Sequence, residues 1–230
     1  MLSAQLRVSV NVPSRCLPIT GIEKEAMLEF FFDCSSPWTY LAFHNILPLA
    51  HAYDEDIEWR PILVGGIFNT INPSVYQSRE KPVPAKARYA QKDLADWARV
   101  AGLKIIRPTI FPVNSVKAMR GCILLQPQDK LVAFARAVFQ AYWSEDRDIS
   151  NDQVLAEICA TIAADQPSFF AGISQQSIKD QLRANTDELI GRGGFGSPTI
   201  YLDRDDMYFG NDRLVLLRAA LEQRRQSERR

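Results

Sequence analysis

The sequence predicts an α/β fold in which an all-helical insertion interrupts a small sheet domain, and two observations lead to this prediction. Strand-like segments occur near residues 27–64 and 199–209, whereas the long stretch between them shows mainly the spacing of helices. The chain has 230 residues, of which 47% are apolar and 23% charged, so it is long enough to bury a sizeable core.

The first part of the sheet domain is predicted to be β-α-β. The nearly continuous apolar run over residues 27–32 is typical of a strand that is covered on both faces. Ser35 or Ser36 then occupies the position of a helix N-cap, ahead of Pro37 at the first helical position. Residues 57–64 form the next candidate strand.

The middle of the chain is predicted to be helical. Apolar residues recur at helical spacing in residues 84–101 and 131–142. A third helix is predicted to begin at Ser150, where Gln153 would complete a capping box. A fourth helix is predicted over residues 174–190.

The C-terminal part is predicted to contain a hairpin and a closing helix. Residues 199–202 and 207–209 have the composition of strands, and the polar turn 203–206 joins them. Asn211 is predicted to cap a last helix that carries Leu214 on its apolar face. The order β-α-β, helical block, β-β-α is that of a thioredoxin-like core with an all-helical insertion.

The domain boundaries follow from this order of elements. We predict that residues 27–66 and 190–225 form the thioredoxin-like core, 67–189 the helical insertion, and 1–26 a poorly ordered N-terminal extension. The extension lacks the apolar segment of a secretory signal. Two interpretations of it stay open: a weak transit-like character, and a natural start at Met27.

Charge and cysteine content exclude several functional classes. The 27 Lys and Arg residues balance the 27 Asp and Glu residues, so no basic excess favours nucleic acid as a partner. No apolar run approaches the roughly 20 residues that cross a bilayer, so no membrane span is expected. The cysteines form no C-x-x-C pair and no close metal-ligand pair, so we expect no bound metal and a reducing, cytoplasmic setting. They are Cys16, Cys34, Cys122 and Cys159.

The first candidate site is Ser36-Pro37 at the predicted strand-to-helix junction. Free backbone N–H groups and the positive end of the helix dipole meet there and favour an anion, such as a thiolate, beside the serine hydroxyl. The alternative is that Ser36 only caps its helix. A serine hydrolase is disfavoured, because the histidines, His44 and His51, lie in the same helix and cannot easily turn back to serve as a base.

The second candidate site follows the glycine-rich residues 191–196. They match the pattern G-x-G-x-x-G, but they follow a helix and precede a strand, which is the reverse of the dinucleotide-binding context. What they lead to is a Ser197-Pro198 bond immediately before a strand. The alternative is an ordinary trans turn.

The third candidate site lies at residues 209–213, where a strand turns through glycine into the last helix. Asn211 and free N–H groups could hold a carboxylate, and Asp212 could hold an ammonium group, as in the head of an amino acid. The alternative is a helix cap with an acid in the first turn, which leaves Arg213 unexplained.

Three motifs occur in order along the chain: Phe32-Asp-Cys-Ser-Ser-Pro-Trp-Thr-Tyr-Leu41, Gly194-Phe-Gly-Ser-Pro-Thr199 and Phe209-Gly-Asn-Asp-Arg-Leu214. Together they resemble the signatures of the 2-hydroxychromene-2-carboxylate isomerase family, which is related to kappa-class glutathione transferases. The resemblance covers about residues 27–222. It implies a thioredoxin-like fold with a helical insertion, a homodimer, and glutathione as the cofactor.

The resemblance also implies roles for individual residues. Ser36 is the implied catalytic residue, whose hydroxyl would donate a hydrogen bond to the sulfur of glutathione and favour its thiolate. Ser36 and Thr39 stand where related disulfide oxidoreductases carry the two cysteines of C-x-x-C, which excludes disulfide exchange through an enzyme dithiol. The residues implied to hold glutathione are Ser36, Ser197, Pro198, Phe209, Gly210, Asn211, Asp212 and Arg213.

The implied activity is the isomerisation of 2-hydroxychromene-2-carboxylate to trans-o-hydroxybenzylidenepyruvate, a step of naphthalene-type aromatic degradation, with glutathione returned unchanged. The expected substrate is therefore a small aromatic carboxylate bound between insertion and core. Two alternatives are a kappa-like glutathione transferase that conjugates electrophiles, and a non-catalytic glutathione-binding or chaperone-like protein. The expected substrate residues are the wall residues Phe68, Asn69 and Asn72 and, as carboxylate partners, Lys86 or Arg88.

Overall fold

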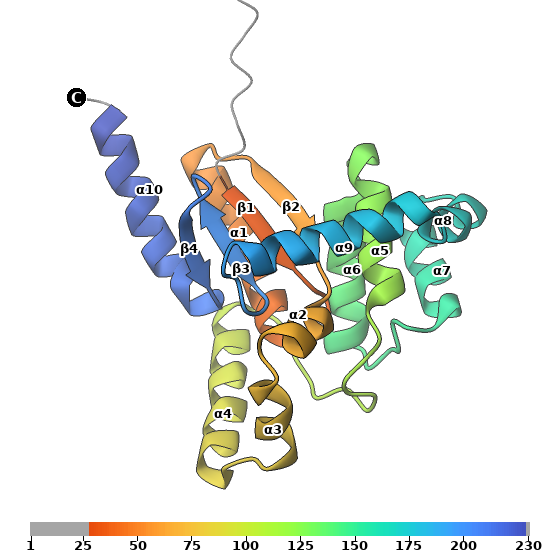
Figure 1. Ribbon diagram of the computed structural model, residues 1–230, viewed down its shortest axis with the longest axis horizontal. Coiled ribbons are helices and arrows are strands. Elements are labelled where there is room, and N and C mark those ends of the chain that lie inside the picture. Colours follow the sequence, from red (N-terminus) through yellow and green to blue (C-terminus); the bar gives the residue numbers. More distant parts are fainter. Residues whose placement is uncertain (1–27, 229–230) are drawn as a thin grey trace, which may run out of the picture.

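The computed structural model describes residues 28–228 (Figure 1), so the predicted extension over residues 1–26 lies outside the described residues. The strands are β1 (Leu28–Phe32), β2 (Ile57–Pro61), β3 (Thr199–Leu202) and β4 (Asp206–Phe209). The α-helices are α1 (Pro37–Tyr53), α2 (Val64–Thr70), α3 (Ser74–Glu80), α4 (Pro84–Val100), α5 (Val116–Leu125), α6 (Leu131–Trp143), α7 (Asp152–Thr161), α8 (Gln166–Ile173), α9 (Gln176–Gly191) and α10 (Leu214–Glu228). Two short 3-10 helices are η1 (Gln126–Gln128) and η2 (Asn211–Arg213).

The sheet has the strand order β2-β1-β3-β4. Strand β1 pairs in parallel with β2, across the crossover helix α1, and antiparallel with β3. Strands β3 and β4 form an antiparallel hairpin. The predicted β-α-β unit, the C-terminal hairpin and the thioredoxin-like fold class are therefore confirmed.

Strand β1 is buried on both faces, as its apolar run predicts. Leu28, Phe30 and Phe32 point into the larger core, which includes side chains of α1 and α6. Phe31 points to the opposite face and packs in a smaller cluster with Ile67 of α2 and Leu189 of α9. Helices therefore cover both faces of the sheet, and Figure 1 shows α9 crossing in front of the strands with α1 behind them.

The remaining helices form two groups beside the sheet. Helix α5 packs against α6, α8 and α9, and α7 packs against α6 and α8. Helices α3 and α4 extend away from the sheet, below it in Figure 1. The predicted helices over residues 84–101, 131–142 and 174–190 correspond to α4, α6 and α9.

Some elements differ from the prediction. Strand β2 ends at Pro61 rather than at residue 64, because its partner β1 ends at Phe32, whose carbonyl oxygen accepts a hydrogen bond from the Ile62 N–H at 3.0 Å, and α2 begins at Val64. Helix α7 begins one residue later than predicted. Its N-cap is Asn151 rather than Ser150, and the Asn151 side chain accepts a hydrogen bond from the Gln153 N–H at 2.9 Å. Helices α2, α3, α5 and α8 were not predicted.

The prediction that Asn211 caps the last helix is wrong. Residues 211–213 form η2, and α10 begins only at Leu214. Asn211 is buried, and its Oδ1 accepts a hydrogen bond from Nδ2 of Asn45 at 2.9 Å. Its side chain therefore connects this turn to α1 instead of closing a helix end.

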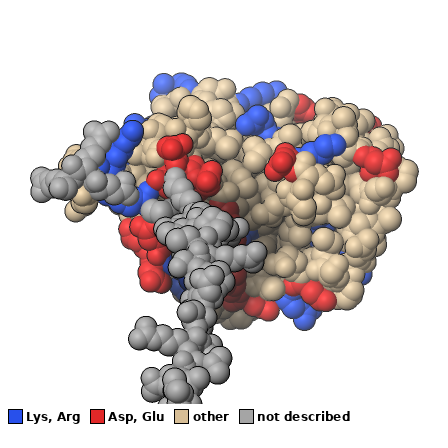
Figure 2. Space-filling model, turned by 90° about the horizontal axis from the view of Figure 1, so that it is seen from above, with Lys and Arg blue, Asp and Glu red and all other residues tan. Residues whose placement is uncertain are grey.

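The described part of the chain carries neither a membrane span nor a metal cluster. Across residues 28–228, every helix is too short or too polar to cross a bilayer. Over the same range, no group of three or more His, Cys, Asp and Glu side chains could hold a metal ion. Figure 2 shows one face, on which acidic and basic side chains are interspersed among uncharged ones.

Candidate active site

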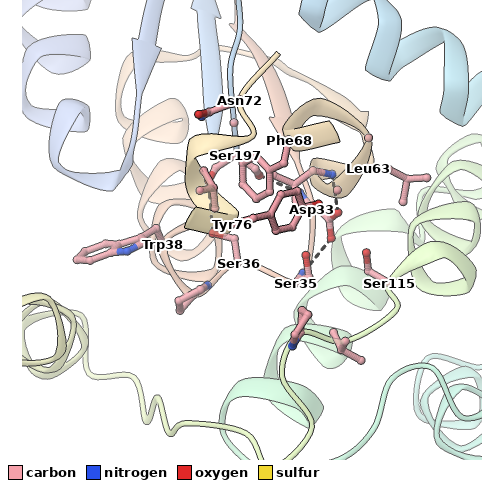
Figure 3. A pocket seen from close by; sticks show the side chains of 18 of the residues that line it. Asp33, Ser35, Ser36, Trp38, Leu63, Phe68, Asn72, Tyr76, Ser115 and Ser197 are labelled. Carbon is pink, nitrogen blue, oxygen red and sulfur yellow. Dashed lines mark hydrogen bonds between the residues drawn. The ribbon is translucent and has the colours of Figure 1, made fainter. Parts of the chain in front are cut away.

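A cleft of about 750 Å³ lies between the β1–α1 junction, α2, α3, the segment 111–116 and the residues that lead into β3 (Figure 3). This volume is within the range of small-molecule sites. The wall combines aromatic side chains, among them Phe68 and Tyr76, with a few polar groups, among them Ser36 and Ser197. It is the place where the predicted insertion meets the predicted core.

Ser36 lies in the cleft wall at the start of α1. It is the N-cap residue, in extended conformation, and its Oγ accepts a hydrogen bond from the Thr39 N–H at 3.3 Å. The same hydroxyl donates to the Ser197 carbonyl oxygen, also at 3.3 Å. Both bonds are long, so the hydroxyl can turn toward another acceptor at small cost. No acid occupies the first turn of α1, which leaves the positive end of the helix dipole uncompensated there.

The β1–α1 junction that carries Ser36 is held by buried contacts. The indole N–H of Trp143 donates to the Cys34 carbonyl oxygen at 2.9 Å, and the Cys34 N–H donates to the sulfur of Met119 at 3.4 Å. Cys34 is itself buried, and burial, followed by contact with Cys122, raises the pKa of its thiol. Cys34 therefore stays a neutral thiol and supports the junction without reacting.

The Ser197-Pro198 peptide bond is cis, so the alternative of an ordinary trans turn is wrong. The Ser197 hydroxyl accepts a hydrogen bond from the Asp33 N–H at 3.0 Å and shares another with the Thr39 hydroxyl at 2.8 Å. Thr39 is fully buried. The two hydroxyls thus join α1 to the approach of β3, directly beside Ser36.

Residues 209–213 continue from the edge of the cleft. Phe209 lines the cleft. Gly210 has a φ of 98°, a backbone conformation that residues with a side chain rarely adopt. Asn211 is buried, and among residues 28–228 its Nδ2 has no hydrogen-bond partner. Asp212 and Arg213 are half exposed and pair with each other. The ion pair with Asp212 explains why a cation is tolerated at position 213, at the start of a helix, where the helix dipole by itself disfavours positive charge.

The predicted substrate residues fall into two groups. Phe68 and Asn72 line the cleft, and Asn69 lies just outside it, where its Oδ1 accepts a hydrogen bond from the Tyr76 hydroxyl at 2.9 Å. Lys86 and Arg88 are exposed on α4 and do not line the cleft. The structure therefore brings the aromatic and amide residues together but not these two cations.

Asp33 is a cleft residue that the sequence reasoning missed. Its side chain is 1% exposed, and its carboxylate accepts hydrogen bonds from the Ser35 and Val64 N–H groups, both at 2.9 Å. Burial raises the pKa of Asp33, while these two N–H groups and the hydroxyl of Ser115 act in the opposite direction. One carboxyl thereby connects the β1–α1 junction to α2 and to the segment before α5. An acid directly after a buried strand is the signal that could have indicated it.

Replacing Asp33 by asparagine is expected to destabilise the protein by about 1–3 kcal/mol, because the amide turns one N–H toward a backbone donor. Burial raises the pKa of Asp33 above 3.8, so the wild type loses stability as the pH rises through this raised pKa and the carboxyl ionises. Asparagine does not titrate, so the variant has no such loss. The loss should therefore shrink as the pH increases from about 4 toward neutral. Urea unfolding of both proteins over this pH range measures it, and a loss that grows with pH contradicts this account.

Tyr76, Arg79 and the segment 111–116 also line the cleft and were not predicted. Their sequences lack a sustained period and a catalytic motif. Phe111 is followed by a cis peptide bond to Pro112, and the Tyr142 hydroxyl donates to the Ile110 carbonyl oxygen at 2.8 Å. This segment is placed by contacts with α6, which are distant in sequence, so local reasoning could not locate it.

The fold and the site together define a class of protein: a thioredoxin-like chain that presents a serine hydroxyl, instead of a cysteine thiol, at the start of its first helix. The chain belongs to the family of DsbA-like thioredoxin domains, whose model matches residues 27–222. Among residues 28–228 the three cysteines are buried and free. Helix α1 therefore begins with Ser36 as its N-cap and contains no cysteine.

Two relatives agree with the family resemblance of the three sequence motifs. The 2-hydroxychromene-2-carboxylate isomerase of Pseudomonas putida is 27% identical over 198 residues, which cover 85% of this chain and 94% of the relative. Glutathione S-transferase kappa 1 of Rattus norvegicus is 27% identical over 208 residues, which cover 83% of this chain and 88% of the relative. The chain is thus similar to both isomerases and transferases, which supports an enzyme.

Solved structures show the same fold. A structure of selenomethionine 2-hydroxychromene-2-carboxylate isomerase matches with a TM-score of 0.75 and 25% identity, over 87% of this chain and 97% of that chain. The cytosolic disulfide reductase DsbM from Pseudomonas aeruginosa, solved with GSH, matches with a TM-score of 0.61 and 18% identity, over 86% of this chain and 97% of that chain. The second likeness concerns the fold alone.

Proposed function

We propose that this protein is a glutathione-dependent cis–trans isomerase that converts 2-hydroxychromene-2-carboxylate, or a similar small aromatic carboxylate, to its open trans isomer. The observation that carries the proposal is the position of Ser36. Its hydroxyl lies at the start of α1, is held by two long hydrogen bonds, and opens onto an aromatic cleft. The names of the isomerase relatives support the choice of reaction.

The residues of the site fit glutathione. Ser36 and Ser197 would receive the cysteinyl part, and residues 209–212 would receive the γ-glutamyl end. Within residues 28–228 the buried Nδ2 of Asn211 has no hydrogen-bond partner, so a carboxylate could satisfy this donor, and an unpaired buried donor is costly to leave alone. The carboxylate of Asp212 is exposed and could accept from an ammonium group.

Bound glutathione would supply a thiolate that adds reversibly to a conjugated carbon and permits rotation about the former double bond. Ser36 favours the ionised form, because its hydroxyl donates a hydrogen bond and the helix start adds positive potential. Each unit by which the thiol pKa falls requires about 1.4 kcal/mol of preferential stabilisation. One hydroxyl and one helix end can supply this amount.

The aromatic wall suits a flat, conjugated substrate. The rings of Phe68 and Tyr76 lie edge to face, with centroids 6.2 Å apart, and Figure 3 shows both rings near Asp33. Phe111 lines the cleft as well. These side chains would exclude water and hold the substrate ring while its double bond rotates.

The second candidate function is a glutathione transferase that conjugates electrophiles, and the kappa-class relatives favour it. The two functions need the same thiolate and differ in whether the sulfur leaves again. A stable glutathione adduct among the products identifies a transferase, and an unmodified isomer with glutathione recovered identifies an isomerase.

To test the proposal, the purified protein is incubated with 2-hydroxychromene-2-carboxylate in the presence and in the absence of glutathione. The reaction products are separated and quantified by chromatography. We expect the trans isomer only when glutathione is present, and no net consumption of glutathione. Isomerisation at the same rate without glutathione contradicts the proposed mechanism. Absence of the trans isomer together with a stable adduct supports the transferase instead.

A further inference from the structure

Arg79 of α3 is a cation in the wall of the cleft. Its guanidinium carbon lies 5.7 Å from the ring centroid of Phe68 and 5.3 Å from that of Phe111. Both distances are within the range of cation–π contacts. Arg79 and both rings line the same cleft.

In the part of the chain that the structure describes, Arg79 has no acidic partner that would neutralise its charge. Among residues 28–228, no carboxylate forms an ion pair with Arg79, although other surface cations have such partners, as in Lys92–Asp96 and Lys117–Asp152. Among the described residues that line the cleft, Arg79 is the only cation and Asp33 the only acid. Aromatic rings contact the guanidinium without using its N–H groups as a carboxylate would, so these donors stay available to a ligand.

The position of Arg79 also separates it from the other cations of this region. Lys86 and Arg88, which the sequence suggested as carboxylate partners, lie outside the cleft lining. A guanidinium binds a carboxylate through two parallel hydrogen bonds, and aromatic rings on either side hold the plane of such a group. Arg79 offers such a guanidinium, with the rings of Phe68 and Phe111 at cation–π distance from it.

We propose that Arg79 selects anionic substrates: its guanidinium binds the carboxylate of an aromatic acid whose ring packs against Phe68 and Phe111. The inference deepens the proposed function and rests on it for the identity of the reacting compound. With the carboxylate at Arg79, the substrate's negative end lies against a positive charge. The cleft should therefore discriminate between an aromatic acid and its uncharged amide.

The test measures binding by calorimetry, without glutathione and without turnover, at pH 7. The probes are trans-cinnamate and cinnamamide, which have the same shape and differ in charge. The variants are Arg79→Met, which keeps the length of the side chain, Arg79→Lys, which keeps its charge, and Arg88→Met as a matched control on the neighbouring exposed helix. Arg79 is exposed, so the variants should fold, and cinnamamide binding checks that the pocket is intact.

We expect the wild type to prefer trans-cinnamate. Arg79→Met should weaken trans-cinnamate binding about 10-fold and leave cinnamamide binding unchanged, with a smaller loss in Arg79→Lys and none in Arg88→Met. Equal losses for both probes, no loss for cinnamate, or no cinnamate binding by the wild type would each overturn the proposal. Because glutathione and catalysis are absent, these outcomes are separate from failure of the isomerase assay.

Discussion

Replacing Ser36 by alanine is expected to lower the glutathione-dependent kcat/KM about 100-fold. The hydroxyl is the donor that the proposed mechanism assigns to the sulfur, and removing one donor aimed at a developing or resident anion costs about 100- to 1,000-fold in other enzymes. Without it, the thiol of bound glutathione should be ionised to a smaller extent at neutral pH. Steady-state kinetics at saturating glutathione measures the effect.

The loss of a helix cap has to be separated from the loss of this donor. Ser36 is the N-cap of α1, so alanine should also cost about 1 kcal/mol of stability. Asn151→Ala is a matched control, because Asn151 is the N-cap residue of α7 and its side chain also accepts a hydrogen bond from a backbone N–H of its helix, but it does not line the cleft. It should lose similar stability and retain full activity. Comparable activity of Ser36→Ala and wild type would refute a catalytic role for the hydroxyl.

Replacing Arg192 by methionine should destabilise the protein by about 3 kcal/mol. The guanidinium of Arg192 bonds both carboxylate oxygens of Glu29, at 2.9 and 2.5 Å, and one oxygen of Glu188 at 3.0 Å. The Glu29 side chain is only 8% exposed. Without Arg192 its charge is left buried, with the weaker contact to Arg60 at 3.4 Å as its remaining ion pair. Denaturant unfolding at pH 7 measures the loss.

The pH dependence of this loss has a definite sign. Burial by itself raises the pKa of Glu29, but hydrogen bonds and charge from Arg192 and then Arg60 outweigh it and hold the pKa below 4.5. In the wild type this contribution is present above pH 4.5 and is lost as the pH falls through the lowered pKa. In the variant, burial dominates, so ionisation of Glu29 costs stability as the pH rises. The difference between the two proteins should therefore be larger at pH 7 than at pH 4.

An exposed ion pair provides the comparison. Arg99 and Asp96 on α4 lie 3.6 Å apart with exposed side chains, so Arg99→Met should leave the free energy of unfolding nearly unchanged, with little dependence on pH. If Arg192→Met changed the free energy of unfolding as little as Arg99→Met does, the buried charge of Glu29 would not need Arg192, and the account of this buried pair would be incorrect.

The fold could be predicted where local pattern and burial agree. The run over residues 28–32 is apolar at every position except Glu29 because helices cover both faces of the sheet, and this pattern identifies β1 as a central strand. Helices α4 and α6 show a clear helical spacing. Helix α2 was missed because Val64 and its neighbours extend the apolar run of β2, and only the end of the ladder at Pro61 separates the two elements.

The site could be predicted where it consists of short motifs. Ser36, Ser197 and residues 209–213 stand in continuous segments whose spacing carries the resemblance, and the structure places Ser36, Ser197 and Phe209 in one cleft. The opposite wall is assembled from α3 and the segment 111–116, whose positions depend on long-range packing. Arg79 could not be preferred over Lys86 or Arg88 from the sequence, because nothing local indicates which of the three faces the cleft.

The central claim is that Ser36 keeps the thiol of bound glutathione ionised, and a thiolate titration tests it most directly. The ultraviolet absorbance of the thiolate is recorded against pH for complexes of glutathione with the wild type, Ser36→Ala and Ser36→Thr. We predict a thiol pKa at least one unit below the value of about 8.5 for a free thiol in the wild type, a return toward that value in the alanine variant, and partial retention in the threonine variant. An equal thiol pKa in the wild-type and alanine complexes would contradict the account.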